Sequence, residues 1–419
     1  MKYRCSICND YEYDESQGDP ETDIKTGTKP SDFPEGWRCP VCGARAIFLK
    51  EKGEIKPIEE PKASYYFPEA EPEKKDVTYY RGIAAEKLLG VCAVNKVCDG
   101  CPDRFCMGQK YGKPIGFGGA GQGHTFTANF KALEKIKLRT HVVKAHHEPE
   151  MEMEFLGKRI PMPVLVSSVS GVAISMNDAI PEPEFQKGMI EGAKLFGTLG
   201  LSGNTVDFPE HPGVDIIKQN QGWGIPIFKP QAQDKLLDLF KKAEEANAVA
   251  IGVDLDGCGS TNWAYRGKPV YRKSERELSE LVDSTNKPVI FKGIMSVEDA
   301  AKVVNSGAAA LDVSNHGGRV LDYGQGVAEV LPDIAKQFKG KITIMADGAV
   351  RTSFDVLKLL ALGADVALIG RPMARMSLAG GAEAVKLYLE YIKSDLRRAM
   401  LMTGCDNLRE VTKDILVRE

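Results

Sequence analysis

The 419-residue sequence has no apolar run close to the roughly 20 residues that a membrane-spanning helix needs. Its first residues, Met1 to Cys5, contain no apolar stretch of the kind found in secretory signals. The net charge is −3, and no basic stripe runs along the chain. These absences argue against membrane insertion, secretion and nucleic-acid binding. We therefore expect a cytoplasmic, globular protein of two or three domains.

An early strand–GxGxxG–helix unit, the mark of a dinucleotide-binding fold, is also missing. Instead, short apolar runs alternate with stretches of helical periodicity from about residue 135 onward. The runs predict strands at residues 163–166, 198–201, 224–229, 249–253, 288–292, 309–313, 342–345 and 366–369. Helices are predicted between them at residues 185–196, 234–247 and 275–284, with another that opens at Ser296. This pattern favours the α/β class and a (β/α)8 TIM barrel over a doubly wound sheet.

Cysteine is unevenly distributed, because eight of the ten cysteines lie before residue 107 in two clusters. The first cluster consists of two CxxC pairs, formed by Cys5, Cys8, Cys39 and Cys42. Two such pairs can build a tetrahedral four-sulfur site for Zn or Fe. In a chain without a secretory signal, they predict metal binding rather than disulfides. Cys258 and Cys405 stand alone and are expected to be ordinary buried thiols.

The residues between the two pairs indicate which metal binds. They include the aromatic and turn segments Tyr11-Glu12-Tyr13-Asp14, Gly18-Asp19-Pro20, Phe33-Pro34 and Trp37. Residues 1–50 therefore resemble rubredoxin, a one-iron electron carrier, and this resemblance implies Fe at the four cysteines. A zinc ribbon is the alternative. Asn9 stands where rubredoxins usually have glycine, and asparagine tolerates positive φ better than most residues.

Two further segments precede the barrel. Residues 51–78 are rich in proline and charge, which predicts a solvated linker. Residues 79–134 form a Cys-rich connecting segment, and the barrel is expected over residues 135–419. The four thiols of the connecting segment belong to Cys92, Cys98, Cys101 and Cys106. They could bind a second iron–sulfur cluster or Zn, or remain free.

Polar residues follow the predicted strands at the ends where TIM-barrel enzymes place their chemistry. Lys292 ends the fifth strand, and the sequence Ser-Asn-His-Gly-Gly-Arg from Ser314 to Arg319 follows the sixth. His316 is the natural general base, because a neutral imidazole accepts protons near pH 7. Arg319 could hold a carboxylate in a two-pronged grip. A core histidine is the alternative, but the flanking glycines and Arg319 favour the catalytic interpretation.

Glycine–arginine combinations follow the seventh and eighth strands. Asp347-Gly348 precedes Arg351 after the seventh strand, and Gly370-Arg371 follows the eighth. Glycine lets backbone N–H groups approach an anion, and arginine adds charge-assisted hydrogen bonds. Two such combinations on adjacent strands predict the common phosphate site of barrel enzymes rather than tight turns with solvated arginines.

Together these segments resemble the FMN-dependent α-hydroxy acid oxidase and dehydrogenase family, which includes glycolate oxidase and flavin lactate dehydrogenases. The resemblance covers roughly residues 125–400. It implies FMN as cofactor and four catalytic residues. His316 would take the substrate proton, and Arg319 would bind the substrate carboxylate. Lys292 would stabilise negative charge at the flavin edge, and Asp256, at the end of the fourth predicted strand, would orient His316.

The resemblance also implies a set of flavin contacts, with departures at the substrate. The contacts are Ser168, Val169, Ser170, Ser202, Lys229, Lys292, Ser314, Asp347, Gly348, Arg351, Gly370 and Arg371. The family's two substrate tyrosines are absent near residues 115 and 231, and Lys229 stands where a glutamine usually meets the flavin. The arginine usual after Asp256 is missing, and Arg266 is the candidate replacement. The flavin and the base therefore carry over, while the substrate does not.

The sequence thus predicts an FMN-dependent oxidoreductase that acts on a 2-hydroxy acid or the corresponding keto acid. It would exchange electrons through its rubredoxin-like iron with an external redox protein. Two alternatives remain: an FMN barrel with another reaction, such as that of glutamate synthase or a reductase fed by the iron, and a non-enzymatic redox sensor or electron-transfer adaptor. By resemblance we also expect a homo-oligomer from an anaerobe, with no nucleic-acid or membrane partner.

Overall fold

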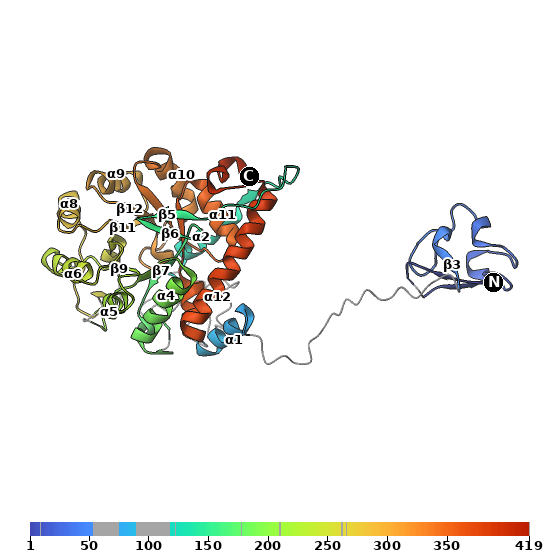
Figure 1. The fold of residues 1–419 in the computed structure, drawn as a ribbon, viewed down its shortest axis with the longest axis horizontal. Coiled ribbons are helices and arrows are strands. Elements are labelled where there is room, and N and C mark those ends of the chain that lie inside the picture. The colour runs from blue at the N-terminus through green and yellow to red at the C-terminus, as the bar shows by residue number, and fades with distance from the viewer. Residues whose placement is uncertain are drawn as a thin grey trace. The chain divides into compact units, whose positions relative to one another are not determined.

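The computed structural model of the chain describes residues 1–8, 10–52, 75–88, 118–121, 123–176, 178–208, 211–260, 263–264 and 266–418. These residues separate into two units, one within Met1–Lys74 and one within Lys75–Glu419 (Figure 1). The second cysteine cluster, Cys92, Cys98, Cys101 and Cys106, lies outside the described residues. So does most of the predicted linker, and both interpretations stay predictions.

The N-terminal unit is built on a three-stranded antiparallel sheet in the order β2-β1-β3. Its strands are β1 (Lys2–Cys5), β2 (Glu12–Asp14) and β3 (Leu49–Glu51), and its 3-10 helices are η1 (Pro20–Thr22), η2 (Pro30–Asp32) and η3 (Ala46–Phe48). Aromatic rings fill its small core. The ring of Phe33 meets Tyr13 edge-on at 4.9 Å and Trp37 at 5.0 Å between centroids. So few buried side chains give a unit of this size little stability, and a metal held by four thiols would add stability.

The second unit contains a closed barrel of eight parallel strands. In chain order they are β7 (Val164–Val169), β8 (Gly200–Ser202), β9 (Ile225–Phe228), β10 (Ile251–Asp254), β11 (Val289–Ile294), β12 (Ala310–Val313), β13 (Thr343–Ala346) and β14 (Val366–Ile369). Strand β14 pairs with β7 and closes the barrel. Each strand overlaps one of the eight predicted runs, so the predicted (β/α)8 TIM barrel is confirmed.

Helices alternate with the strands and surround them (Figure 1). They are α3 (Val172–Ser175), α4 (Glu182–Phe196), α5 (Pro212–Gln219), α6 (Gln233–Glu245), α8 (Glu275–Asp283), α9 (Val297–Asn305), α10 (Val327–Phe338), α11 (Ser353–Leu362) and α12 (Arg371–Thr403). The short 3-10 helices of this unit are η4 (Leu255–Gly259), η5 (His316–Gly318), η6 (Leu408–Glu410) and η7 (Lys413–Ile415). Outside the alternation lie α1 (Val77–Lys87), α2 (His124–Glu134) and two small antiparallel sheets, β4 (Ile136–Leu138) with β15 (Leu416–Arg418) and β5 (Met153–Phe155) with β6 (Lys158–Ile160).

The predicted helices agree with the observed ones in type and place. Residues 185–196, 234–247 and 275–284 fall on α4, α6 and α8. The Ser296 side chain accepts a hydrogen bond from the backbone N–H of Asp299, which is the N-cap predicted for α9. Among the helices that the structure describes, none combines the length and the apolar character that crossing a membrane requires.

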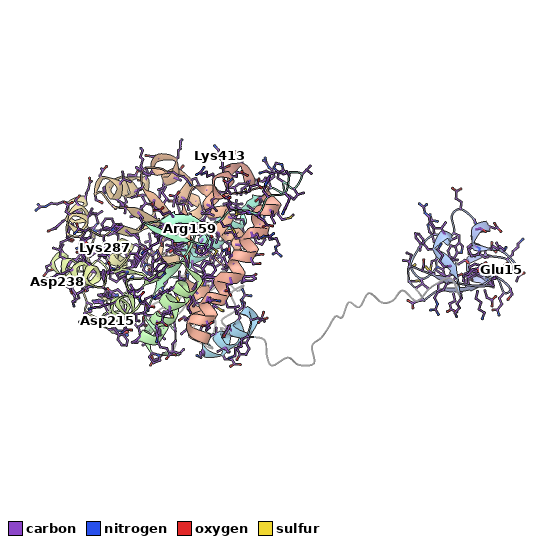
Figure 2. All side chains as sticks on the ribbon, in the orientation of Figure 1. Glu15, Arg159, Asp215, Asp238, Lys287 and Lys413 are labelled. Atoms are coloured by element: carbon purple, nitrogen blue, oxygen red, sulfur yellow. The ribbon has the colours of Figure 1, made fainter. Side chains whose placement is uncertain are left out.

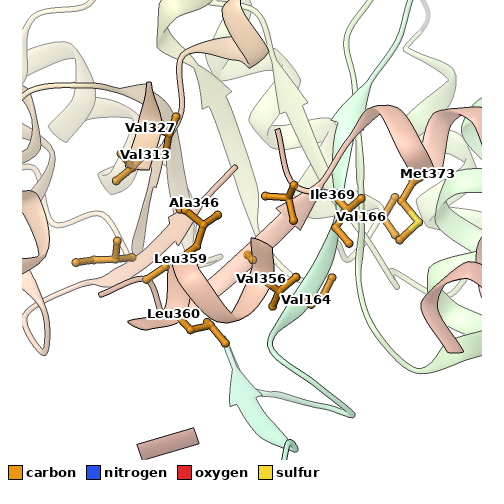
Figure 3. Packing of buried hydrophobic residues seen from close by; sticks show 14 of the residues in the cluster. Val164, Val166, Val313, Val327, Ala346, Val356, Leu359, Leu360, Ile369 and Met373 are labelled. Carbon is orange, nitrogen blue, oxygen red and sulfur yellow. The ribbon is translucent and has the colours of Figure 1, made fainter. Parts of the chain in front are cut away.

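Apolar side chains hold the helices on the barrel. Figure 3 shows part of this layer, with Val164 and Val166 of β7, Ile369 of β14 and Val356 of α11, all of them fully buried. The opposite faces of the helices are polar, and Asp238 of α6 lies at the outside in Figure 2. Each helix therefore buries one stripe against the strands and leaves the other in water, as the periodicity predicts.

The register of neighbouring strands brings charged residues together at the end of the barrel. Asp254 of β10 pairs with Lys292 of β11, which in turn pairs with Asp312 of β12. Strand β10 ends at Asp254, whereas Asp256 lies beyond the strand in η4. The prediction that Asp256 ends the fourth strand is therefore wrong by two residues, and Asp254 takes that place.

Candidate active site and metal centre

A cavity that is partly open to solvent lies at the carboxyl ends of the barrel strands. Of the predicted site residues, it is lined by Ser168, Val169, Ser170, Lys229, Lys292, His316, Arg319, Asp347, Gly348, Arg351, Gly370 and Arg371. Ser202, Asp256 and Ser314 are not among the lining residues. The chain thus brings most of its predicted site together at one opening, from segments up to two hundred residues apart.

His316 is held by two carboxylates. Its Nδ1 lies 3.0 Å from Asp256 Oδ1 and 3.3 Å from Asp254 Oδ2. Burial alone would lower the pKa of His316, but Asp254 and then Asp256 raise it above its usual value, against the opposing charge of Lys229. Sequence reasoning found Asp256 and missed Asp254. A carboxylate at the end of a buried barrel strand was the signal that pointed to it.

The two carboxyl groups titrate differently. Burial raises the pKa of Asp256 to about 6, and the charge of Asp254 adds to the shift. Burial also acts to raise the pKa of Asp254, but the nearby His316 and Lys229 hold it well below the usual value. The two carboxyl groups are coupled, and Asp254 is the one whose surroundings favour the charged form.

The backbone around His316 needs its two following glycines. His316 itself has φ 58°, and Gly317 and Gly318 continue in the left-handed region. A Cβ on Gly318 would lie 2.4 Å from the backbone N of Phe126 in α2. A Cβ on Gly317 would lie 2.5 Å from Arg371 Nη1. The glycines thus let α2 and the arginine close in on the segment that presents the imidazole.

Lys292 is buried among acceptors from two neighbouring strands. Its Nζ lies 3.0 Å from Asp312 Oδ2 and 2.7 Å from Asp347 Oδ2, and it also donates to Ser314 Oγ. Ser314 is therefore a partner of Lys292 below the cavity surface. Burial opposes the charged lysine, but the two aspartates raise its pKa well above the usual value. Asp312 was missed by sequence reasoning, because an acidic residue inside an apolar strand gives no motif.

Two aromatic rings of α2 pack against arginine side chains and line another side of the cavity. The Cζ of Arg351 lies 4.5 Å from the ring centroid of Phe130, and that of Arg371 lies 4.7 Å from Phe126. Arg319 donates to Ser175 Oγ at 3.0 Å. The two phenylalanines were missed, because α2 falls in the segment predicted to be Cys-rich. Their i, i+4 spacing was the available signal.

Two arginines differ from expectation. Arg375 of α12 is 7% exposed and lines the cavity, although no motif singled it out. Arg266, the candidate replacement for the family's second substrate arginine, does not line the cavity. Its Nε lies 3.0 Å from Asp207 Oδ1 instead. The structure thus gives no support to Arg266 as the replacement for the family's second arginine, and that interpretation stays a prediction.

These residues suit a phosphorylated, ring-bearing cofactor. Gly348 and Gly370 open the backbone at the ends of β13 and β14, and Arg351 and Arg371 stand beside them. The Arg351 Nε is buried and has no hydrogen-bond partner among the residues that the structure describes. An anion at this point would satisfy that donor.

The four cysteines of the N-terminal unit converge on one point. Cys5 Sγ lies 3.7 Å from Cys42 Sγ, and Cys8 Sγ lies 3.9 Å from Cys39 Sγ. All four sulfurs lie within 4.8 Å of one another. A tetrahedron of metal–sulfur bonds of about 2.3 Å has edges of about 3.8 Å, so the thiols fit a single four-coordinate ion. The predicted metal site is thus assembled with the geometry that it requires.

Comparisons with known proteins find a match for the barrel unit and another for the N-terminal unit. The sequence model of the FMN-dependent dehydrogenase family matches residues 116–266 and 266–418, and that of rubredoxin matches residues 2–47. The L-lactate oxidase of Lacticaseibacillus rhamnosus is 28% identical over 326 residues, which are 70% of this chain and 86% of the relative. The L-lactate dehydrogenase of Ectopseudomonas mendocina is 30% identical over 358 residues, with 72% and 93% covered.

A solved structure of a mandelate oxidase variant with an FMN adduct superimposes with a TM-score of 0.61 at 27% identity, over 72% of this chain and 93% of that one. The family binds FMN, and four clustered cysteines in a rubredoxin domain provide an iron site. The chain is an enzyme that belongs to the FMN-dependent dehydrogenase family, to which the 2-hydroxy acid oxidases and dehydrogenases belong, and it carries an N-terminal rubredoxin domain.

Proposed function

We propose that this enzyme oxidises a 2-hydroxy acid, or reduces the corresponding keto acid, and exchanges the electrons through its own rubredoxin iron. The observation that carries the proposal is the setting of His316. The imidazole lines the cavity while its Nδ1 is occupied by Asp256 and Asp254, so Nε2 is the nitrogen that remains for a substrate. Such an arrangement defines the tautomer and the direction of proton transfer.

The chain's own residues divide the work on the substrate. His316 accepts the hydroxyl proton at Nε2, and the carboxylates at Nδ1 stabilise the imidazolium that results. Arg319 lines the same cavity and binds the substrate carboxylate. Its hydrogen bond to Ser175 Oγ fixes the guanidinium plane for this contact. In the reverse direction the same imidazolium returns the proton to the keto oxygen.

The remaining lining residues hold the cofactor. Arg351, Arg371, Gly348 and Gly370 would hold its phosphate, and Lys292 would meet the flavin edge. The segment Ser168, Val169 and Ser170 after β7, with Lys229 after β9, provides further contacts. FMN, when bound, supplies the two-electron acceptor for the hydrogen at C2. Behind the cavity surface, Ser314 accepts a hydrogen bond from Lys292, and Ser202 pairs with Val169 in the barrel sheet.

The iron domain favours a dehydrogenase over an oxidase. The relatives include both an L-lactate oxidase and L-lactate dehydrogenases, so the barrel alone does not determine the electron acceptor. A one-electron carrier on the same chain would serve no purpose if O2 took the electrons directly. We therefore propose an external redox protein as the partner, and by resemblance to the family a homo-oligomeric assembly. The non-enzymatic adaptor is excluded, because the chain belongs to an enzyme family.

Anaerobic titration tests the proposal. L-lactate, glycolate, mandelate and other 2-hydroxy acids are added in turn while absorption is followed. The yellow flavin band is expected to bleach first and the red Fe(III)-thiolate band second. In His316→Gln the bleaching rate is expected to fall by about 10²–10⁴-fold with flavin content unchanged. If no acid in a broad panel bleaches the wild-type flavin, the proposed reaction is wrong.

A further inference from the structure

Lys229, predicted as a flavin contact, lies in direct contact with the proposed base His316. It follows directly after β9 and lines the cavity, with a side chain 12% exposed. Its Nζ lies 2.5 Å from Asp254 Oδ2 and 3.3 Å from His316 Nε2. Nε2 is the nitrogen that a substrate hydroxyl must reach. The ammonium group and the imidazole therefore meet at the same point of the cavity.

The surroundings keep the lysine in this position. Its backbone N–H donates to Asn204 Oδ1 at 3.2 Å. Asn204 is fixed in turn by His211, whose Nδ1 lies 2.6 Å from Asn204 Nδ2. Burial lowers the pKa of His211 to about 4, so the ring is neutral and accepts this bond. A Cβ on Gly257 would lie 2.8 Å from Lys229 Cδ, so that glycine leaves room for the lysine stem.

An ammonium group has donors and no acceptor, so its contact with Nε2 requires a lone pair there. The proton of the neutral imidazole then sits on Nδ1, toward Asp256. This is the tautomer that can accept a proton from a substrate. A C2 oxygen placed within reach of Nε2 also comes within reach of the lysine.

We propose that Lys229 is a catalytic residue that contacts the C2 oxygen of the substrate beside His316 and offsets the two carboxylates behind the imidazole. The inference rests on the proposed function. In the oxidation, the hydroxyl O–H bond breaks and an N–H bond forms at His316 Nε2. FMN, when bound, would be the oxidant that takes the C2 hydrogen with its electron pair. Lys229 stabilises the negative charge that develops on the oxygen.

The charges around the imidazole determine how the pKa of His316 should change when the charge of Lys229 is removed. Asp254 of β10 and Asp256 of η4 lie next to Nδ1 of His316, whereas Lys229 lies next to Nε2. Arg319 lines the same cavity, and Lys292 of β11 pairs with Asp254 of β10. The two aspartates raise the pKa of His316, and Lys229 opposes them. Without the lysine charge, the imidazole would hold its proton to higher pH and lose its function as a base there.

Three substitutions separate the lysine's charge from its hydrogen bond. Lys229→Met removes both, Lys229→Gln keeps a donor without charge, and Lys229→Arg keeps both. Lys218→Met, at an exposed site of α5 away from the cavity, is the control. Two measurements are made on the FMN-loaded enzyme. The first is kcat/KM against pH under anaerobic conditions. The second is the titration of His316 by NMR of carbon-labelled histidine without substrate, assigned with His316→Gln.

Lys229→Met is expected to lower the plateau of kcat/KM by about 10²-fold, the usual loss for one donor at a developing charge. It should also move both the acid limb and the His316 midpoint to higher pH. Lys229→Gln should share the midpoint shift but lose less at the plateau, and Lys229→Arg should keep the wild-type midpoint. Asp254→Asn should move the midpoint the opposite way, which shows that charge is the cause.

An unchanged acid limb and an unchanged His316 midpoint in both Lys229→Met and Lys229→Gln would overturn the inference and leave the lysine as a flavin or structural contact. Flavin content and circular dichroism equal to those of Lys229→Arg exclude misfolding as the cause of a loss. If no 2-hydroxy acid reduces the wild-type enzyme, the proposed function fails by itself. The NMR midpoint then still decides whether Lys229 acts on His316.

Discussion

Two lysines at the barrel mouth are paired with carboxylates from other strands or the segments that follow them. Lys229 meets Asp254, and Lys292 meets Asp312 and Asp347. Charges in a protein core cost free energy unless they are paired, and even paired charges rarely add stability over apolar residues. The clustering of several such groups around one cavity therefore indicates chemistry rather than stability as the reason that they are there.

Asp312 offers a test at this scale through the pH dependence of stability. Burial raises its pKa to about 7, with Asp347 adding to the shift against Lys292. In the unfolded chain the pKa of an aspartate is about 3.9. The folded state thus binds an extra proton between about pH 4 and pH 7, so this group's contribution to the free energy of unfolding is complete below pH 4 and is lost as pH rises to 7.

Asp312→Asn is expected to remove that dependence. Near pH 5 the variant should be within about 1 kcal/mol of wild type, because asparagine resembles the protonated carboxyl group. Above pH 7 it should gain about 1–2 kcal/mol relative to wild type. Urea unfolding followed by helical circular dichroism measures this, with the exposed Asp299→Asn as the control. A constant difference across pH would mean that Asp312 stays ionised.

Motifs in the glycine-flanked segments after the strands were found from the sequence, whereas charges set by strand register were not. His316, Arg319 and Arg371 stand in glycine-flanked segments after strands, and all three line the cavity. Asp312 is recognisable as a partner of Lys292 only once the parallel register places the two side by side. Register depends on pairing between distant segments, which no local pattern encodes.

At the scale of helices and strands, periodicity was a sound guide because every strand of the barrel is buried on both faces and every helix on one. The exception is α2 (His124–Glu134), which follows the Cys-rich stretch and whose phenylalanines line the cavity. Its placement comes from the close approach of Phe126 to Gly318, a contact across almost two hundred residues. Local composition could not reveal such a contact.

Glycines on α4 show how tightly two of these elements pack. A Cβ on Gly192 would lie 2.5 Å from Val385 Cβ and 2.7 Å from the Ala382 carbonyl oxygen in α12. Gly192→Ala is expected to destabilise the barrel by about 1–3 kcal/mol, because overpacking outweighs the better helix propensity of alanine. Thermal or urea unfolding by circular dichroism measures the change.

Gly82 on α1 is the matched control. It is exposed, and a Cβ there would meet nothing within 4 Å. Gly82→Ala should therefore stabilise the protein by up to about 1 kcal/mol, the propensity difference alone. Equal effects of the two substitutions would show that α4 and α12 move apart at no cost, contrary to the packing argument.

At the scale of the whole chain, two units with separate cores carry separate cofactors. The aromatic core around Tyr13 and Trp37 contains only residues of the N-terminal unit, and the barrel cores contain only residues of the second unit. Separate cores imply that the loss of one centre leaves the other folded. The domain boundaries that we predicted at residues 50 and 78 and the Cys-rich segment remain predictions, since most of that stretch lies outside the described residues.

Cys39→Ser uses this separation to divide the proposed reaction into halves. Cys39 is buried and its Sγ lies 3.9 Å from Cys8 Sγ, so its loss removes one corner of the tetrahedron. The red iron band and the iron content are expected to fall, while a 2-hydroxy acid should bleach the flavin at the wild-type rate. Reduction of an external one-electron acceptor protein should drop by at least about tenfold, because the barrel then lacks its one-electron exit.

Cys405→Ala, at a lone thiol of the barrel, should keep both centres and both activities. Acceptor reduction that persists without iron would show that electrons leave from the barrel itself, and the rubredoxin domain would need another role.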